Sequence, residues 1–132
     1  MAKRSDSGSG MTARRDFPPD ARIRLKRDFA YAFAEGTRVR LRLFTAVVVP
    51  GNGQRSRLGL VIGRKVDRKA HRRNRIRRRL REGFRHNQSR IAGIWDIVVL
   101  AGAGCLGCPW SELQRDFDVL IGRIQAMSEE GT

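Results

Sequence analysis

Residues 64–85, RKVDRKAHRRNRIRRRLREGFR, constrain the fold more than any other part of the sequence. Twelve Lys and Arg residues stand against two acids in these 22 positions, a local net charge of +10. On a helical wheel of 3.6 residues per turn, the apolar positions share one narrow arc: Ile76, Leu80, Gly83 and Phe84. The opposite arc carries a row that we expect to be fully exposed: Asn74, Arg75, Arg78, Arg81 and Arg85. The stretch predicts a helix over residues 69–85 with one thin stripe facing a core.

A cationic helix face is either a solvated surface or a binding surface for a polyanion. Solvated helices normally interleave charges of opposite sign. Here like charges repeat at i, i+4, each such pair costs roughly 0.2–0.5 kcal/mol, and Glu82 is the one acid inside the helix. The whole 132-residue chain carries a net charge of +15, and a bound phosphate backbone would relieve this self-repulsion. We therefore expect a nucleic-acid partner.

Other partners and compartments are disfavoured by what the sequence lacks. No apolar run approaches the ~20 residues of a membrane span, so we expect no membrane partner. The start, MAKRSDSGSGMTARRD, lacks the apolar stretch of a signal peptide, which predicts a cytoplasmic protein. Cys105 and Cys108 are too few for a disulfide framework. Their spacing matches half a zinc site, but nothing brings in two further ligands, so we expect no metal site on the protein.

The remaining pattern predicts one α+β domain, a two-layer α/β sandwich of the ribosomal-protein-like kind. We expect a disordered basic tail over residues 1–16, the domain over residues 17–127 and a flexible C-terminus over residues 128–132. The order is α-β-β-α-β-α, with helices covering one sheet face at least in part. The predicted helices are 26–35, 69–85 and 110–127, and the predicted strands are 40–50, 56–65 and 95–102. The turn signal PGNG predicts that the first two strands form a hairpin.

Several segments, in register, match the motifs of one protein family. RRNRIRRRLRE, residues 72–82, resembles the Arg-Asn-Arg signature helix of the bacterial ribonuclease P protein component, and GLVIGRKVDRKAH resembles the strand and crossover before it. LKRDFAYAFAEG resembles the family's first helix, RLFTAVVV its first strand, and WDIVVLA the strand after the signature helix. The resemblance runs from about Phe17 to Ile124, whereas the tail and the linker GAGCLGCPW have no counterpart. The resemblance is therefore a far more specific signal than one arginine-rich helix would be.

The resemblance implies an accessory subunit that binds the catalytic ribonuclease P RNA and the 5′ leader of precursor tRNA. Hydrolysis would come from the RNA with Mg²⁺ bound through it, so no protein residue is expected to be catalytic and no cofactor to bind the protein alone. The implied RNA-binding residues are Arg64, Lys65, Arg68, Arg72, Arg73, Asn74, Arg75, Arg77, Arg78, Arg81 and Arg85. The implied leader cleft consists of Phe29 and Phe33 with an exposed sheet face that includes Phe44 and Val47. Val47 falls where relatives can carry an aromatic residue.

Two alternatives stay open at this point, and two further ones are disfavoured. Phe29 and Phe33 also fit ordinary core packing at helical spacing. A structural ribosomal protein or an RNA chaperone could share the charge and the fold without a role in cleavage. A DNA-binding regulator is disfavoured because no helix-turn-helix pair or dimerising helix is present, and a protein nuclease is disfavoured because the acids are scattered along the chain.

Overall fold

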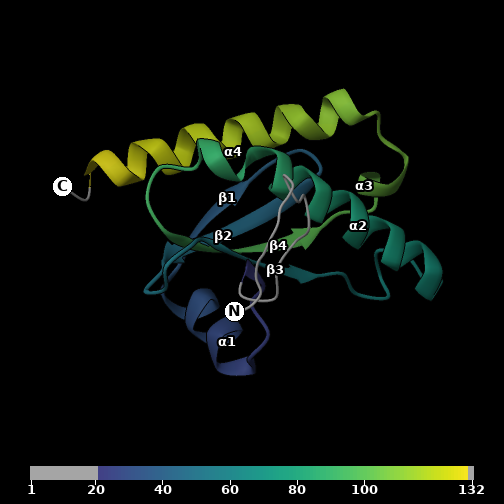
Figure 1. Cartoon of the computed structure of the whole chain (residues 1–132). Coiled ribbons are helices and arrows are strands. Elements are labelled where there is room, and N and C mark those ends of the chain that lie inside the picture. Colours follow the sequence, from purple (N-terminus) through teal and green to yellow (C-terminus); the bar gives the residue numbers. More distant parts are fainter. Residues whose placement is uncertain (1–20, 131–132) are drawn as a thin grey trace, which may run out of the picture.

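The computed structural model describes residues 21–130, which form a four-stranded mixed sheet with helices on both of its faces (Figure 1). The helices are α1 (Lys26–Glu35), α2 (Ala70–Asn87), α3 (Gly104–Gly107) and α4 (Trp110–Glu130), with a 3-10 turn at Gln88–Arg90. The strands are β1 (Thr37–Arg40), β2 (Phe44–Pro50), β3 (Arg57–Val61) and β4 (Trp95–Ala101). This architecture confirms the predicted α+β fold class. The predicted tail lies outside the described residues, and α4 continues three residues past the predicted end of the domain.

The strand order is β1-β2-β4-β3, which corrects the predicted hairpin. β2 pairs antiparallel with β4, and β3 pairs parallel with β4, so β4 lies between the two strands that were expected to be partners. α2 returns the chain so that β4 starts beside the start of β3, as a parallel connection requires. The predicted strand over residues 40–50 is also two strands, because a turn at residues 41–43 folds β1 back onto β2.

The main core lies between α2, α4 and one face of the sheet. Alternate residues of β2 point to this side, where Phe44, Ala46 and Val48 are buried. They meet the apolar stripe of α2 and the matching stripe of α4, including Leu113, Phe117, Leu120 and Ile124. In Figure 1 both helices lie on the same side of the sheet. This packing fixes which side of α2 is turned away from the protein.

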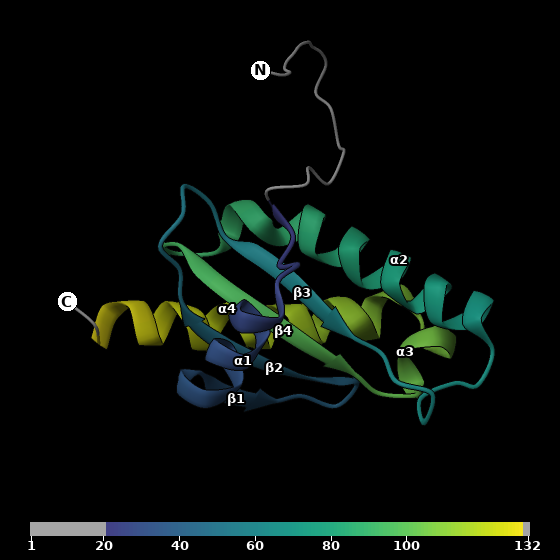
Figure 2. The same ribbon diagram turned by 90° about the horizontal axis from the view of Figure 1, so that it is seen from below.

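A smaller core lies on the other face of the sheet, beneath α1. Here Val47, Val49 and Val98 pack with Ile23 and Ala32, so β2 is buried on both faces. α1 crosses the strands and leaves one end of this sheet face uncovered (Figure 2). Among residues 21–130, no helix is long and apolar enough to cross a membrane.

Gly83 sets how closely α2 approaches α4. A Cβ atom built on Gly83 would overlap the ring of Phe117. A Cβ built on Gly122, which lies within α4, would meet no atom within 4 Å. The two glycines therefore differ in packing although both are helical.

We predict opposite effects of alanine at these two glycines. Gly83→Ala should lower the free energy of unfolding by about 1–3 kcal/mol, because overpacking outweighs the helix propensity of alanine. Gly122→Ala should raise it by about 0.5–1 kcal/mol. Urea denaturation of both variants measures this difference, and a stabilised Gly83→Ala variant would contradict the packing described here.

Candidate nucleic-acid interface

α2 begins at a carboxylate that organises its first turn. Lys69, the residue before the helix, makes no side-chain cap. Instead the carboxylate of Asp67 accepts the backbone N–H of Lys69 at 3.0 Å and Nε–H of Arg72 at 2.6 Å. These two donors hold the pKa of Asp67 below its usual value. Arg73 donates to the carbonyl oxygens of Asp67 and Arg68, both at 2.9 Å. The crossover before α2 is thereby tied to the helix by its own arginines.

The predicted RNA-binding residues, on α2 and in the crossover before it, divide into an exposed and a half-buried group. The exposed members of the predicted RNA-binding set are Arg64, Lys65, Arg68, Arg72, Asn74, Arg75 and Arg78. The half-buried members are Arg73, Arg77, Arg81 and Arg85. The expectation that Arg81 and Arg85 lie in a fully exposed row is therefore wrong. Arg85 folds back onto the carboxylate of Glu82, and Arg81 lies in a groove against β3.

This groove runs along the outer edge of β3 and holds about 270 Å³. It is lined by Arg22, Ile23, Arg24, Phe29, Leu58, Leu60, Arg77 and Arg81. The segment before α1 forms one wall, because Arg22 bridges to Leu58 and the N–H of Ile23 donates to the Leu58 carbonyl at 3.0 Å. α2 forms the other wall. An apolar floor thus lies between cations that come from two distant parts of the chain.

The electrostatics of the groove favour an anion. Burial is the main cause that lowers the pKa of Arg81, and the neighbouring positive charges of Arg22 and Arg77 lower it further. Repulsion among guanidinium groups weakens when a negative group enters between them. None of the lining residues is acidic. A phosphate group is the chemical partner that fits this wall.

Phe44 and Val47 do not lie on an exposed sheet face, so that part of the leader-cleft prediction is wrong. Phe44 is 2% exposed, and its ring lies 5.3 Å from that of Phe117, centroid to centroid, in the main core. Val47 is 0% exposed and belongs to the cluster beneath α1. Both faces of this inner strand are covered, which the alternation of residues within one strand could not show.

The uncovered part of this sheet face lies two residues along β2 from Val47, toward Phe44. The pairing register places Arg40 opposite Thr45, Thr45 opposite Leu100, and Leu100 opposite Val61. These four residues form a row across the sheet on the same face as α1, and each is exposed or half-buried. They replace Phe44 and Val47 as the sheet surface beside α1.

Phe29 and Phe33 border this surface from α1, but over different strands. A Cβ built on Gly59 of β3 would lie 2.8 Å from a ring atom of Phe29, so Phe29 lies directly over β3 and is half-buried. Phe33 is exposed, and the guanidinium carbon of Arg38 from β1 lies 5.8 Å from its ring centroid. Prediction from sequence missed Arg22, Arg24, Arg38 and Arg40. Arg22 and Arg24 alternate with apolar residues, as do Arg38 and Arg40, but the sequence could not show which surface these two pairs border.

Arg79 faces α3 rather than solvent. Its guanidinium donates to the carbonyl oxygens of Cys105 at 2.6 Å, Leu106 at 2.9 Å and Cys108 at 2.8 Å. Burial raises the pKa of the Cys105 thiol to about 11, and this thiol donates to the Leu43 carbonyl at 3.2 Å. No group of three or more His, Cys, Asp or Glu residues that could hold a metal occurs among residues 21–130. Arg79 and the two cysteines therefore organise the linker into α4.

Comparison with known proteins shows to which family a chain with this fold and this basic helix belongs. The family model described as Ribonuclease P matches residues 17–125. The ribonuclease P protein component of Pseudomonas aeruginosa is 40% identical over 111 residues, which cover 83% of this chain and 82% of that protein. The chain belongs to the ribonuclease P protein family. The relative from Desulfatibacillum aliphaticivorans is 36% identical over 108 residues, covering 82% of this chain and 91% of that protein.

Solved structures of ribonuclease P proteins share the architecture. The protein from Thermotoga maritima superimposes with a TM-score of 0.70 at 34% identity, covering 78% of this chain and 96% of that one. The protein from Staphylococcus aureus superimposes with a TM-score of 0.66 at 25% identity, covering 82% and 94%. As a family member, the protein is a subunit of the endoribonuclease that matures the 5′ ends of tRNAs. This membership replaces the alternative of a ribosomal protein or RNA chaperone, and it implies ribonuclease P RNA as a partner.

The different surroundings of Arg79 and Arg78 predict that substitution of Arg79 lowers stability, whereas substitution of Arg78 weakens RNA binding. Arg79→Met should lower the free energy of unfolding by about 1–3 kcal/mol, because partly buried carbonyl oxygens lose their donor. Arg78→Met should leave stability unchanged. In filter binding to ribonuclease P RNA, however, Arg78→Met should reduce the slope of log affinity against log salt by about 0.7–0.9 for each lost phosphate contact.

Urea denaturation and salt titration of both variants separate the two roles. A folded Arg79→Met protein whose salt slope fell as far as that of Arg78→Met would show that Arg79 binds RNA.

Proposed function

We propose that the exposed face of α2 binds the catalytic ribonuclease P RNA while the groove beside β3 and the adjacent sheet surface hold the 5′ leader of precursor tRNA. The observation that carries this proposal is the meeting of Phe29 with four arginines over an apolar floor. The protein then acts by position and charge, so that the precursor binds better than the mature product. The proposal rests on the groove and not on the charge of α2 alone.

The chemistry of the groove suits a single strand of variable sequence. Single-stranded RNA is held by a cationic groove that follows the backbone and by aromatic rings on which bases stack, each stack contributing ~1–3 kcal/mol. Phe29 offers a partly accessible ring, and Arg22, Arg24, Arg77 and Arg81 surround it. None of these groups requires a particular base. The groove therefore fits leaders that differ from one tRNA to the next.

The charge pattern also supports hydrolysis by the RNA with Mg²⁺ bound through it. Mg²⁺ is bound by carboxylate and phosphate oxygens. The carboxylates within the basic stretch, residues 64–85, are those of Asp67 and Glu82, and both are paired with arginines of α2. The N–H of Lys69, followed by Arg72, lowers the pKa of Asp67, and the hydrogen bond from Arg85 lowers the pKa of Glu82. The protein's contribution is to lower the repulsion between RNA strands, which reduces the Mg²⁺ that the reaction needs.

The direct test is cleavage of a 5′-labelled precursor tRNA by a bacterial ribonuclease P RNA at low Mg²⁺, with the protein, without it, and with the protein alone. Strong cleavage only when both components are present supports the proposal. Tight binding of that RNA without any rescue of cleavage would refute it.

A conservative substitution in the groove separates leader binding from folding. Phe29→Leu keeps an apolar side chain over Gly59 but removes the stacking ring. It should reduce the preference of the holoenzyme for precursor over mature tRNA by about tenfold. Tyr31→Ala is the matched control, because Tyr31 is an exposed aromatic residue of the same helix.

The measurement is the ratio of dissociation constants for precursor and mature tRNA in each variant. If Phe29→Leu weakened both ligands equally, or if Tyr31→Ala had the same effect, the assignment of the leader to this groove would be wrong.

A further inference from the structure

The two tryptophans of the chain lie in opposite surroundings. Trp95 is 9% exposed, and its indole N–H donates to the carbonyl of Ala92 at 2.8 Å. Trp110, the first residue of α4, is 39% exposed. Tryptophan combines a large apolar ring with a polar N–H, which suits it to interfaces rather than to open solvent. Trp95 belongs to the main core, whereas Trp110 keeps more than a third of its surface open to solvent.

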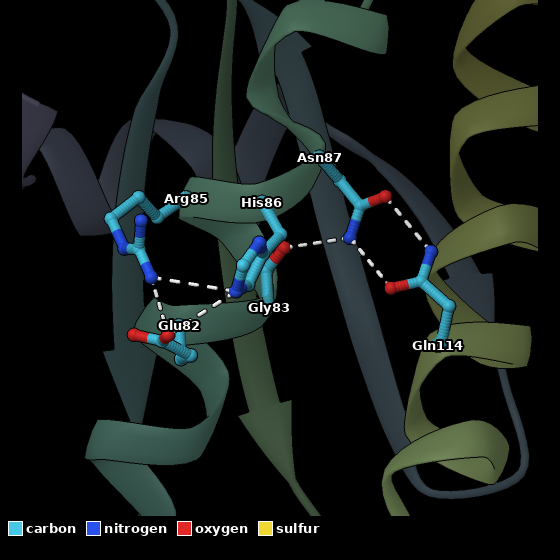
Figure 3. Close-up of polar contacts among 6 residues, drawn as sticks. All are labelled: Glu82, Gly83, Arg85, His86, Asn87 and Gln114. Atoms are coloured by element: carbon cyan, nitrogen blue, oxygen red, sulfur yellow. Dashed lines mark hydrogen bonds and ion pairs between the residues drawn. The ribbon is translucent and has the colours of Figure 1, made fainter. Parts of the chain in front are cut away.

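Trp110 borders the basic helix through His86. The two ring centroids are 5.9 Å apart with an interplanar angle of 69°, an edge-to-face contact. His86 is held in turn by the Glu82 carboxylate at 3.2 Å, which also pairs with Arg85 (Figure 3). In the same view, Asn87 and Gln114 join α2 to α4 through paired side-chain amides at 2.8 and 3.1 Å. Trp110 thus lies against α2 through its edge contact with His86, close to amides that join the two helices.

The linker that leads into Trp110 is also fixed by the arginine helix. Arg79 binds the carbonyl of Cys108, two residues before Trp110, as well as those of Cys105 and Leu106. Pro109 follows, and its carbonyl accepts the first bonds of α4 from the N–H groups of Glu112 and Leu113. A ring held in place before binding loses little conformational freedom when a ligand stacks on it.

The chemistry of this flank points to a nucleobase. Positions 75, 79, 82 and 86 follow one another at i, i+4, i+7 and i+11, so exposed Arg75 lies on the same flank of α2 as His86. Arg75 is the exposed cation of this flank, because Arg79 is bound to α3 and position 82 is acidic, and the aromatic ring lies at the far end. Unpaired bases stack on tryptophan and histidine rings, whereas the bases inside a paired helix are already stacked on one another.

We propose that Trp110, with His86 at its edge, is a stacking platform for an unpaired nucleotide of the catalytic ribonuclease P RNA. The platform lies where α4 begins beside α2, whereas the groove assigned to the leader lies at the edge of β3, between α2 and the segment before α1 (Figures 1 and 2). This inference rests on the proposed docking of α2 on that RNA. It adds a base contact to a surface otherwise described only by its charge.

The test uses the full chain and measures its dissociation constant for ribonuclease P RNA. Trp110→Ala should weaken binding by about tenfold, whereas Trp110→Phe, which keeps a ring, should recover most of the affinity. The salt slope should stay the same in both variants, because no phosphate contact is lost. Val119→Ala is the matched control, since it removes an exposed apolar side chain from the same helix.

Fluorescence supplies a second readout that does not depend on a destabilising variant. A stacked base quenches indole emission, so RNA should quench the wild-type protein. The emission that remains in Trp110→Phe comes from buried Trp95 and should change little. The difference between the two titrations reports on Trp110 alone.

The outcomes separate this inference from the proposed function. If wild-type protein binds the RNA but Trp110→Ala binds it equally well and the wild-type emission is not quenched, the platform is refuted and the function stands. If Trp110→Ala instead reduces the preference for precursor over mature tRNA without affecting RNA binding, the platform assignment is also overturned. If the wild-type protein does not bind ribonuclease P RNA at all, the proposed function fails together with it.

Discussion

The burial of one thin apolar stripe on α2 holds the rest of the structure in place. Ile76, Leu80 and Phe84 are each at most 2% exposed, and Gly83 lets Phe117 approach the helix backbone. Removing a buried side chain of this size costs about 2–5 kcal/mol. That stabilisation opposes the mutual repulsion of the arginines on the same helix. Because the stripe is narrow, it also fixes the rotation of α2, and therefore which arginines meet solvent, α3 and β3.

The crossover through α2 explains why the candidate site lies where it does. β3 pairs with β4 on one side only, so its other edge remains beside α2. The segment before α1 bridges part of that edge at Leu58. Arg77 and Arg81 from α2 then face Arg22 and Arg24 from that segment across a shared floor. An edge strand that would otherwise invite pairing with another chain becomes the floor of a cationic groove.

The sequence predicted local structure well and lateral arrangement poorly, for physical reasons that particular residues illustrate. The predicted helix over residues 69–85 starts one residue before the first residue of α2 and stops two residues before its last one. The agreement is close because the stripe from Ile76 to Phe84 is a local periodic signal. The strand around Val47 was also found. Its neighbours were not, because pairing of β2 with β4 rather than β3 depends on residues about 50 positions apart. Phe44 and Val47 were misplaced for the same reason, since alternation within one strand does not show whether a second layer covers its other face.

The sequence also could not show how deeply each arginine is buried, and this burial matters for function. A helical wheel places Arg78 and Arg81 near each other, yet Arg78 is exposed and Arg81 is half-buried beside Arg22 and Arg77. Exposed cations are screened by solvent and salt, whereas cations in a groove repel one another more strongly. A phosphate that enters the groove therefore gains attraction and removes repulsion together. RNA bound in this groove should therefore reduce the repulsion between arginines more than RNA bound along the open face of α2. A ligand that binds only the folded protein also stabilises it.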